Sequence, residues 1–283
     1  MKFHMKKISA LTALIIIAVF LFVLILVLDK AEAKKATEQT TEPVQTEETT
    51  PPTEDPYAHA HNGLDRLVIY ARLTDQSLDE WPDYMQELAY RNPDAYEYVR
   101  NYPQKKGQLL DIDLSSLVGT GEVPTLYQWD DRWGYSLYGN MEMGLTACGP
   151  TCLSMISLYF LEDAKYTPRY IADWAKENKY YIDGSGTIMA IMSEGAKKLG
   201  LNVENIPLDP GTMLNHLKKG NLIVCSMGPG IFTTAGHYIL LVGEQDGKVM
   251  IHDPNSPTNT AQLWEIETFK DQIKNLWAYK PVK

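Results

Sequence analysis

The stretch LTACGPTCLSM, from Leu145 to Met155, decides how this chain folds and what chemistry it can carry. Pro150 has the fixed φ that is favoured in the first turn of a helix, where its missing N–H costs nothing. Apolar side chains follow at helical spacing, which predicts a helix with an apolar face. Cys148 is therefore expected at the helix N-terminus, where the helix dipole and free N–H groups favour a thiolate, the reactive form of cysteine.

A candidate base for this cysteine comes later in the chain. Residues 236–243 read as a buried strand with His237 at its entry, and Asp246-Gly247 is a typical hairpin turn. The returning strand, residues 248–252, is followed by Asp253. An antiparallel pair would place His237 beside Asp253, and nucleophilic cysteine chemistry needs such a base and a group that orients it.

Each of these residues also has an ordinary structural explanation. A cysteine in an apolar context is usually a small core residue, and Cys152 and Cys225 are expected to be of that kind. A histidine in a strand is often a hydrogen-bonded core residue, and an aspartate before proline is often a turn residue. The chain has three cysteines, an odd number that implies no full disulfide framework, although a bond between Cys152 and Cys225 stays open.

The region from about 123 to 280 resembles the bacteriocin-leader-processing family of cysteine peptidases, the thirty-ninth family, and within it the stand-alone, surface-exposed branch of Gram-positive bacteria. The matching segments are Gln128 to Trp133, Cys148 to Thr151, Gly186-Thr187, Phe232 to His237, and Asp253-Pro254. The resemblance implies a papain-like α+β fold, in which a helical half carries the nucleophile and packs on an antiparallel sheet that carries the base. It implies Cys148 as the nucleophile, His237 as the general base and Asp253 as the orienting acid.

The donor for the oxyanion follows less directly. Many members of this family carry a glutamine six residues before the cysteine, and Glu142 stands at that position here. In the surface-exposed branch, which this chain resembles, the glutamine heads the Gln-x-Asp-x-x-Trp segment. The resemblance thus implies Gln128 as the donor, while a solvent-exposed loop glutamine is the alternative.

The rest of the chain predicts four segments. Residues 1–33 contain an uncharged apolar run from Ile8 to Leu28, long enough for a membrane-spanning signal anchor, while Ala31-Glu32-Ala33 leaves a cleaved signal peptide open. Residues 34–56 are an acidic Thr/Pro/Glu linker, expected to be disordered. Residues 57–121 form a helical lead-in that is expected to pack on the catalytic domain, and a propeptide that covers the cleft is the alternative. Residues 122–283 form the peptidase domain.

Within the peptidase domain, the sequence pattern predicts further elements. Strands are expected at 222–227, 238–243, 249–252, 262–266 and 276–279, and Thr187 is expected to cap a helix that ends at Gly200. Trp264 and Trp277 are expected in the core.

Charge and motifs limit the partners. The net charge of −10 argues against nucleic acid, and no cofactor or metal site is expected. The predicted partners are a peptide or protein substrate and, through the N-terminal helix, the membrane; no oligomeric state is predicted. The favoured function is a thiol peptidase outside the cytoplasm, anchored by a single span or secreted after cleavage at Ala33. An acyl or peptidyl transferase with the same triad and a non-catalytic peptide-binding domain are the alternatives.

Overall fold

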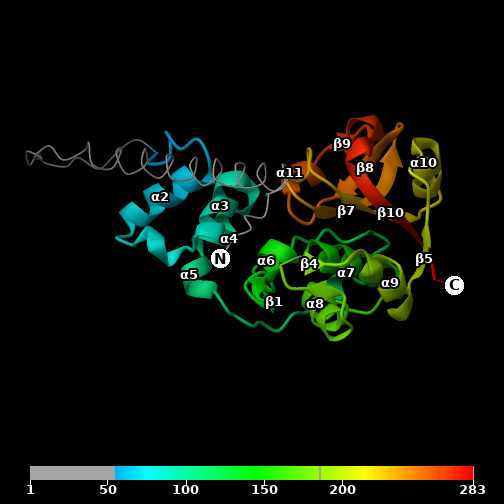
Figure 1. The fold of residues 1–283 in the computed structure, drawn as a ribbon, viewed down its shortest axis with the longest axis horizontal. Helices are drawn as coiled ribbons and strands as arrows, with labels where there is room; N and C mark the ends of the chain where they lie inside the picture. The colour runs from blue at the N-terminus through cyan, green and yellow to red at the C-terminus, as the bar shows by residue number, and fades with distance from the viewer. Residues whose placement is uncertain (1–54, 185, 283) are drawn as a thin grey trace, which may run out of the picture. The chain divides into compact units, whose positions relative to one another are not determined.

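The computed structural model describes residues 55–184 and 186–282, which combine helices with antiparallel β-strands (Figure 1). The predictions of a signal anchor or signal peptide at 1–33 lie outside the described residues, as does almost all of the predicted linker. Among the helices that are described, none combines the length and the apolar character needed to cross a bilayer.

The main sheet has six antiparallel strands in the order β5-β10-β6-β7-β8-β9. Their bounds are β5 Asn202–Asn205, β6 Leu222–Met227, β7 His237–Gln245, β8 Lys248–His252, β9 Leu263–Trp264 and β10 Ile273–Lys280. The five strands predicted from the sequence are all present, and the β7–β8 hairpin turns at Asp246-Gly247 as expected, with both residues at positive φ. Strand β5 was not predicted. Three of its four residues are polar and exposed, and Val203 is the one that is buried.

Both faces of the central strands are buried, which explains why they read as continuous apolar runs. On one face, Val224 of β6 and Leu240 of β7 pack in a core with α7 (Cys148–Leu161) and α8 (Pro168–Glu177). On the other face, Ile223 and Ile239 pack with α10 (Pro210–Lys218). Figure 1 shows α7 and α8 on one side of the sheet and α10 on the other. The layers place the start of α7 close to the start of β7.

The helix that Thr187 was expected to cap is divided in two, and Thr187 does not cap it. Thr187 ends a small hairpin, β3 (Tyr181–Ile182) with β4 (Gly186–Thr187), and the helical part is divided into η4 (Met189–Met192) and α9 (Glu194–Lys198). The division falls at Ser193, which lies between the two helices with φ −116° and ψ −74°. A second small hairpin pairs β1 (Leu137–Tyr138) with β2 (Met141–Glu142), and α6 (Met143–Thr146) leads from it into α7.

The lead-in is helical, as predicted, and shares its core with the peptidase domain. Its elements are α2 Gly63–Leu73, η1 Leu78–Glu80, α3 Asp83–Arg91, η2 Pro93–Ala95, α4 Tyr96–Arg100, α5 Tyr102–Lys105 and η3 Ser115–Leu117. Trp81 is fully buried and its indole N–H donates to the Val99 carbonyl at 2.7 Å. Tyr98 stacks on Tyr135 with ring centroids 4.5 Å apart, and each hydroxyl donates to a backbone carbonyl across the boundary. The boundary at 121/122 stays a prediction.

Candidate active site

Helix α7 begins at Cys148, as the Gly-Pro step predicted. The first N–H groups of a helix have no partner within it, so those around Cys148 are free to stabilise negative charge. Its side chain is partly exposed, whereas Cys152 and Cys225 are fully buried. Burial raises the pKa of both buried thiols, so neither is a source of thiolate.

No disulfide joins the three cysteines, and all of them are free thiols. Cys152 packs in the core on the α7 face of the sheet, and its thiol donates to the Tyr238 carbonyl at 3.5 Å. Cys225 packs in the core on the opposite face, with α10. Strand side chains alternate between faces, so the sheet itself separates the two sulfurs that the sequence left open as a pair.

His237 and Asp253 lie side by side, as the predicted hairpin required. His237 is the first residue of β7, and its Nε2 lies 2.7 Å from Oδ1 of Asp253, which follows β8 directly. Both are almost completely buried, with exposed fractions of 7% and 1%. Because Nε2 is engaged by the carboxylate, Nδ1 is the ring nitrogen left to exchange a proton with Cys148, which lines the same cleft.

The electrostatics favour a charged pair. Burial by itself would lower the pKa of His237, but the Asp253 carboxylate and, to a smaller extent, the neighbouring Cys148 outweigh it and raise that pKa to about 10. Burial would raise the pKa of Asp253, yet His237 and the hydrogen bonds from Asn259 and the Asn255 N–H hold it below its ordinary value. Asp253 is therefore ionised at neutral pH and stabilises an imidazolium.

Residues 253–260, here called the acid loop, hold Asp253 in place. The Asn255 N–H donates to Oδ1 at 2.9 Å and the Asn259 amide donates to Oδ2 at 2.8 Å. The Asp253 N–H donates to the Thr260 hydroxyl at 3.0 Å. Ser256 caps the short helix α11 (Pro257–Thr260) by accepting from the Asn259 N–H. A buried carboxylate with this many donors is fixed in orientation.

Gln128 is buried beside the same site and is not the solvent-exposed loop residue of the alternative. Its side chain is 3% exposed and its amide donates to the Gly144 carbonyl at 2.8 Å. Its backbone N–H donates to the Pro254 carbonyl at 2.7 Å, which connects it to the acid loop. One hydrogen bond leaves a second amide hydrogen, so Gln128 retains the capacity of an oxyanion donor.

Glu142 has a structural environment. Tyr102 donates to its Oε1 at 2.8 Å and Tyr84 approaches the same oxygen at 3.4 Å. The carboxylate is buried, with an exposed fraction of 6%. It thereby connects the hairpin before α7 to two tyrosines of the lead-in.

A cleft of about 580 Å³ brings the predicted site residues together. Its lining includes all four of Cys148, His237, Asp253 and Gln128, with α3 of the lead-in on one side and the loop 230–236 on the other. Arg91 of α3 donates to the Thr234 hydroxyl at 3.1 Å, which joins the two sides. Among the described residues, no group of three or more His, Cys, Asp or Glu side chains is arranged to hold a metal ion.

Sequence reasoning missed the residues that support this cleft from outside the peptidase domain. Asn92 and Asp94 contact the acid loop from the lead-in, more than 160 residues earlier in the chain. The Asn92-Pro93 pair signals a helix start, and Asn92 does cap η2 by accepting from the Asp94 N–H. That local signal says nothing about a distant contact.

The close approach of Gly149 to β4 gives a first prediction. A Cβ at Gly149 would lie 2.9 Å from Thr187 Cγ2. Thr187 cannot move freely, because its hydroxyl and carbonyl are hydrogen-bonded to Tyr138 and Tyr238. Gly149→Ala is therefore expected to lower the free energy of unfolding in urea by about 1–3 kcal/mol.

Gly236→Ala is the matched control for this change. A Cβ there meets nothing within 4 Å, so its free energy of unfolding is expected to stay within about 0.5 kcal/mol of wild type. Equal stability of Gly149→Ala and wild type would show that the Thr187 contact is not tight.

Comparison with known proteins identifies the family. The model described as the Peptidase C39-like family matches residues 120–281, which is more than half of the chain. The chain belongs to the peptidase C39-like family. Membership suggests a cysteine peptidase and agrees with the resemblance noted from the sequence. The match begins after most of the lead-in, so Asn92 and Asp94 lie outside the region that defines the family.

Solved peptidase domains are similar to parts of this chain. The peptidase domain of Streptococcus ComA, a bi-functional ABC transporter involved in quorum sensing, is 22% identical over 48% of this chain and 93% of its own, with a TM-score of 0.39. A C39-like peptidase of Bacillus anthracis is 16% identical over 61% of this chain and 100% of its own, with a TM-score of 0.36. A comparison with curated proteins gives no match.

Proposed function

We propose that this chain is a thiol peptidase that hydrolyses peptide bonds through an acyl-enzyme on Cys148, with His237 as the general base and Asp253 as its orienting acid. The observation that carries the proposal is the buried 2.7 Å contact between His237 and Asp253 in the cleft that Cys148 also lines. The fold proposed with it is papain-like, with the nucleophile on a helix and the base on the antiparallel sheet.

Acylation uses the proton that His237 takes from Cys148. The Cys148 thiolate attacks the carbonyl carbon of the scissile bond, and the carbonyl oxygen becomes an oxyanion. The second amide hydrogen of Gln128 and the backbone N–H of Cys148 are the proposed donors to that oxygen. His237 gives its proton to the leaving amine, the C–N bond breaks, and a thioester remains on Cys148.

Deacylation reverses these roles with water. His237 takes a proton from a water molecule while the oxygen of that water attacks the thioester carbon. The same donors stabilise the second oxyanion, the C–S bond breaks, and the sulfur leaves as a thiolate beside the newly charged imidazolium. Asp253 stays ionised throughout and holds His237 in the orientation that both transfers require.

The cleft is proposed to take a peptide or an extended segment of a protein. Its walls offer apolar contacts, including Leu88 of α3, Leu145 of α6 and Ile231 of the opposite loop, with polar groups between them. Ile231 is about half exposed, which leaves apolar surface for a substrate side chain. The lead-in is thus proposed to form a wall of the substrate groove, while the propeptide alternative stays untested.

We also propose that the site works outside the cytoplasm. The support is the apolar run from Ile8 to Leu28 with the acidic segment after it. Retention of the intact chain in membranes after alkaline carbonate extraction would favour an anchor, and a soluble chain beginning after Ala33 would favour a cleaved signal. Recovery of the intact chain in the cytosol would contradict both.

The decisive test of the proposed chemistry is selective alkylation. Iodoacetamide at neutral pH is expected to label Cys148 well before Cys152 and Cys225, with the sites measured by mass spectrometry. His237→Ala should slow the labelling of Cys148 strongly, because the thiolate loses its proton acceptor.

His252→Ala is the matched control for His237→Ala. His252 is the neighbour of Asp253, but its ring contacts the Pro124 carbonyl and the Thr125 hydroxyl instead of the site. Labelling of Cys148 should therefore persist in His252→Ala. Equally slow labelling of all three cysteines in the wild type would contradict the proposal that Cys148 is an activated nucleophile.

A further inference from the structure

Two residues of the lead-in, Asn92 and Asp94, contact the acid loop directly. The Asp94 carboxylate accepts hydrogen bonds from the Ser256 hydroxyl at 2.6 Å, the Thr258 hydroxyl at 2.8 Å and the Thr258 N–H at 3.3 Å. The Asn92 amide donates to the carbonyl and side-chain oxygens of Asn255 at 2.8 and 3.1 Å. Every one of these contacts falls on the segment that fixes Asp253.

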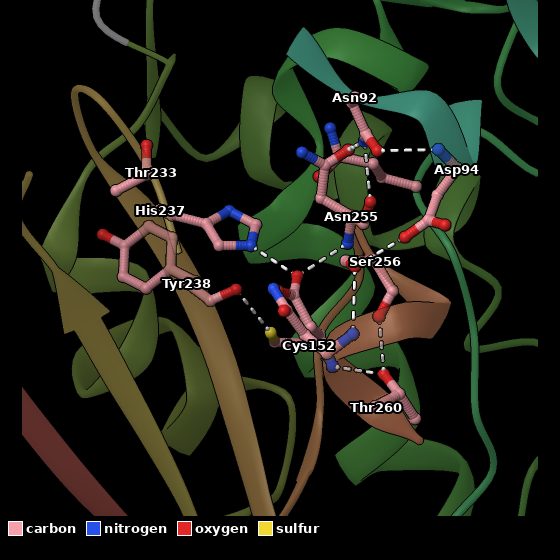
Figure 2. A network of polar contacts seen from close by, with 12 residues as sticks. Asn92, Asp94, Cys152, Thr233, His237, Tyr238, Asn255, Ser256 and Thr260 are labelled. Carbon is pink, nitrogen blue, oxygen red and sulfur yellow. Dashed lines mark hydrogen bonds and ion pairs between the residues drawn. The ribbon is translucent and has the colours of Figure 1, made fainter. Parts of the chain in front are cut away.

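The network runs from the lead-in to the imidazole without a break. Asp94 holds Ser256, Ser256 caps α11 through the Asn259 N–H, and the Asn259 amide donates to Asp253. Asn92 holds Asn255, whose N–H donates to the oxygen of Asp253 that faces His237. Figure 2 shows His237 on one side of this network and Asn92 and Asp94 on the other, with Asn255 and Ser256 between them.

From this geometry we infer that Asp94 is a positioning residue, which holds the acid loop so that Asp253 meets His237. The expected fall in kcat rests on the proposed function. The expected change in the pKa of His237 does not depend on turnover. Asp94 lines the cleft but makes no hydrogen bond to Cys148 or His237, and its side chain holds Ser256 and Thr258 instead, so its effect on the reacting atoms passes through Asp253. The peptidase site is therefore completed by a segment outside residues 120–281, the part of the chain that matches the family.

The chemistry of Asp94 suits this role. A carboxylate with three donors makes charge-assisted hydrogen bonds that are stronger and shorter than neutral ones. The acid loop is a connection with one short helix, and such segments open locally unless they are held. Asn92 and Asp94 supply side-chain contacts where the loop has little regular structure of its own.

The charged and titratable groups that line the cleft are Tyr84, Glu87, Arg91, Asp94, Cys148, His237 and Asp253, and Arg91 is paired with Glu87. His237 faces Asp253 and Cys148. Tyr127 lies close to both Asp94 and Asp253, and burial raises the pKa of its phenol, which therefore stays neutral below alkaline pH. Loss of the Asp94 charge would act on His237 mainly through the position of Asp253, because the contacts of Asp94 end on Ser256 and Thr258.

The experiment measures the pKa of His237 by NMR in the full chain with ¹⁵N-labelled histidine, its signal assigned by its absence in His237→Ala. Asp94→Ala is expected to lower this pKa by about one pH unit, because a displaced Asp253 stabilises the imidazolium less. On a peptide that the wild type cleaves, kcat per alkylatable Cys148 should fall about tenfold or more, with KM nearly unchanged. Asp94→Glu, which keeps the charge, should recover part of both losses.

Two further variants keep the inference falsifiable. Glu97→Ala removes an exposed lead-in carboxylate paired with Arg100, so both readouts should stay at wild-type values. Thr258→Val keeps the shape of the side chain and removes one bond to Asp94, so it tests the contact even where Asp94→Ala unfolds the chain. Its effect should be smaller than that of Asp94→Ala and non-additive with it.

The outcomes separate the two proposals. An unchanged pKa of His237 in both Asp94→Ala and Thr258→Val would overturn the positioning role of Asp94. A wild-type chain that cleaves no peptide would instead overturn the proposed function. The NMR titration would still decide whether Asp94 holds the pair of Asp253 and His237.

Discussion

Replacing Cys148 by alanine is expected to reduce peptide turnover by about 10⁴-fold or more, because no other thiol can form the acyl-enzyme. Cys152 is one helical turn away, but burial raises its pKa well above the ordinary thiol value and its hydrogen is directed at the Tyr238 carbonyl. The measurement is the rate of cleavage of a peptide found by library screening, with thermal unfolding to show that the variant is folded.

Cys225→Ala is the matched control for this loss. Cys225 is another buried free thiol, but it packs on the face of the sheet away from α7. Its replacement should leave turnover at the wild-type rate and lower stability by about 1 kcal/mol. Wild-type turnover by Cys148→Ala would exclude Cys148 as the nucleophile, and products joined to an added amine would favour transfer over hydrolysis.

The parts of the fold that the sequence predicts well are those with strong local signals. Strands β6, β7 and β8 are apolar runs joined or bounded by turn residues, so their existence and nearly their bounds follow from pattern. The start of α7 follows from the Gly149-Pro150 step. The proximity of His237 and Asp253 follows from the hairpin between their strands, because a short turn leaves little freedom of register.

The elements that the sequence predicts poorly depend on tertiary contacts. Strand β5 is polar and is recognisable only by its pairing with β10. Thr187 was expected to cap a helix, but it lies in the β3–β4 hairpin, where it contacts Tyr138 and Tyr238. Local helix propensity is a weak prior when side chains at a distance fix the backbone.

The residues of the candidate site also fall into those that the sequence predicts and those that only the fold reveals. Cys148, His237 and Asp253 stand out because each combines a reactive side chain with a local position of known use. Asn92 and Asp94 have only the local signature of a helix start, and nothing within the chain near them points to residues 253–260. Their role becomes visible once the fold brings the lead-in against the acid loop.

Removal of the Asp253 charge is expected to have the second large effect. Asp253→Ala should lower kcat at neutral pH by about 10²-fold or more, because His237 loses both its orientation and its counter-charge. Without the carboxylate, burial dominates and favours the neutral imidazole, so the pKa of His237 should fall from about 10. The alkaline limb of kcat/KM, set by loss of the His237 proton, should move to lower pH accordingly.

Asp253→Asn separates orientation from charge. The amide oxygen can still accept from His237 Nε2, so this variant should keep more turnover than Asp253→Ala, while the alkaline limb of its kcat/KM profile should still move to lower pH.

The raised pKa of His237 also makes the free energy of unfolding depend on pH. By linkage, its contribution to stability is fully present below the ordinary pKa of 6.5 and is lost as the pH rises through about 10. The stability of wild type should therefore decline across that interval more than that of Asp253→Asn, measured by urea unfolding at several pH values. An alkaline limb unmoved in both variants would mean that Asp253 does not set the protonation of His237.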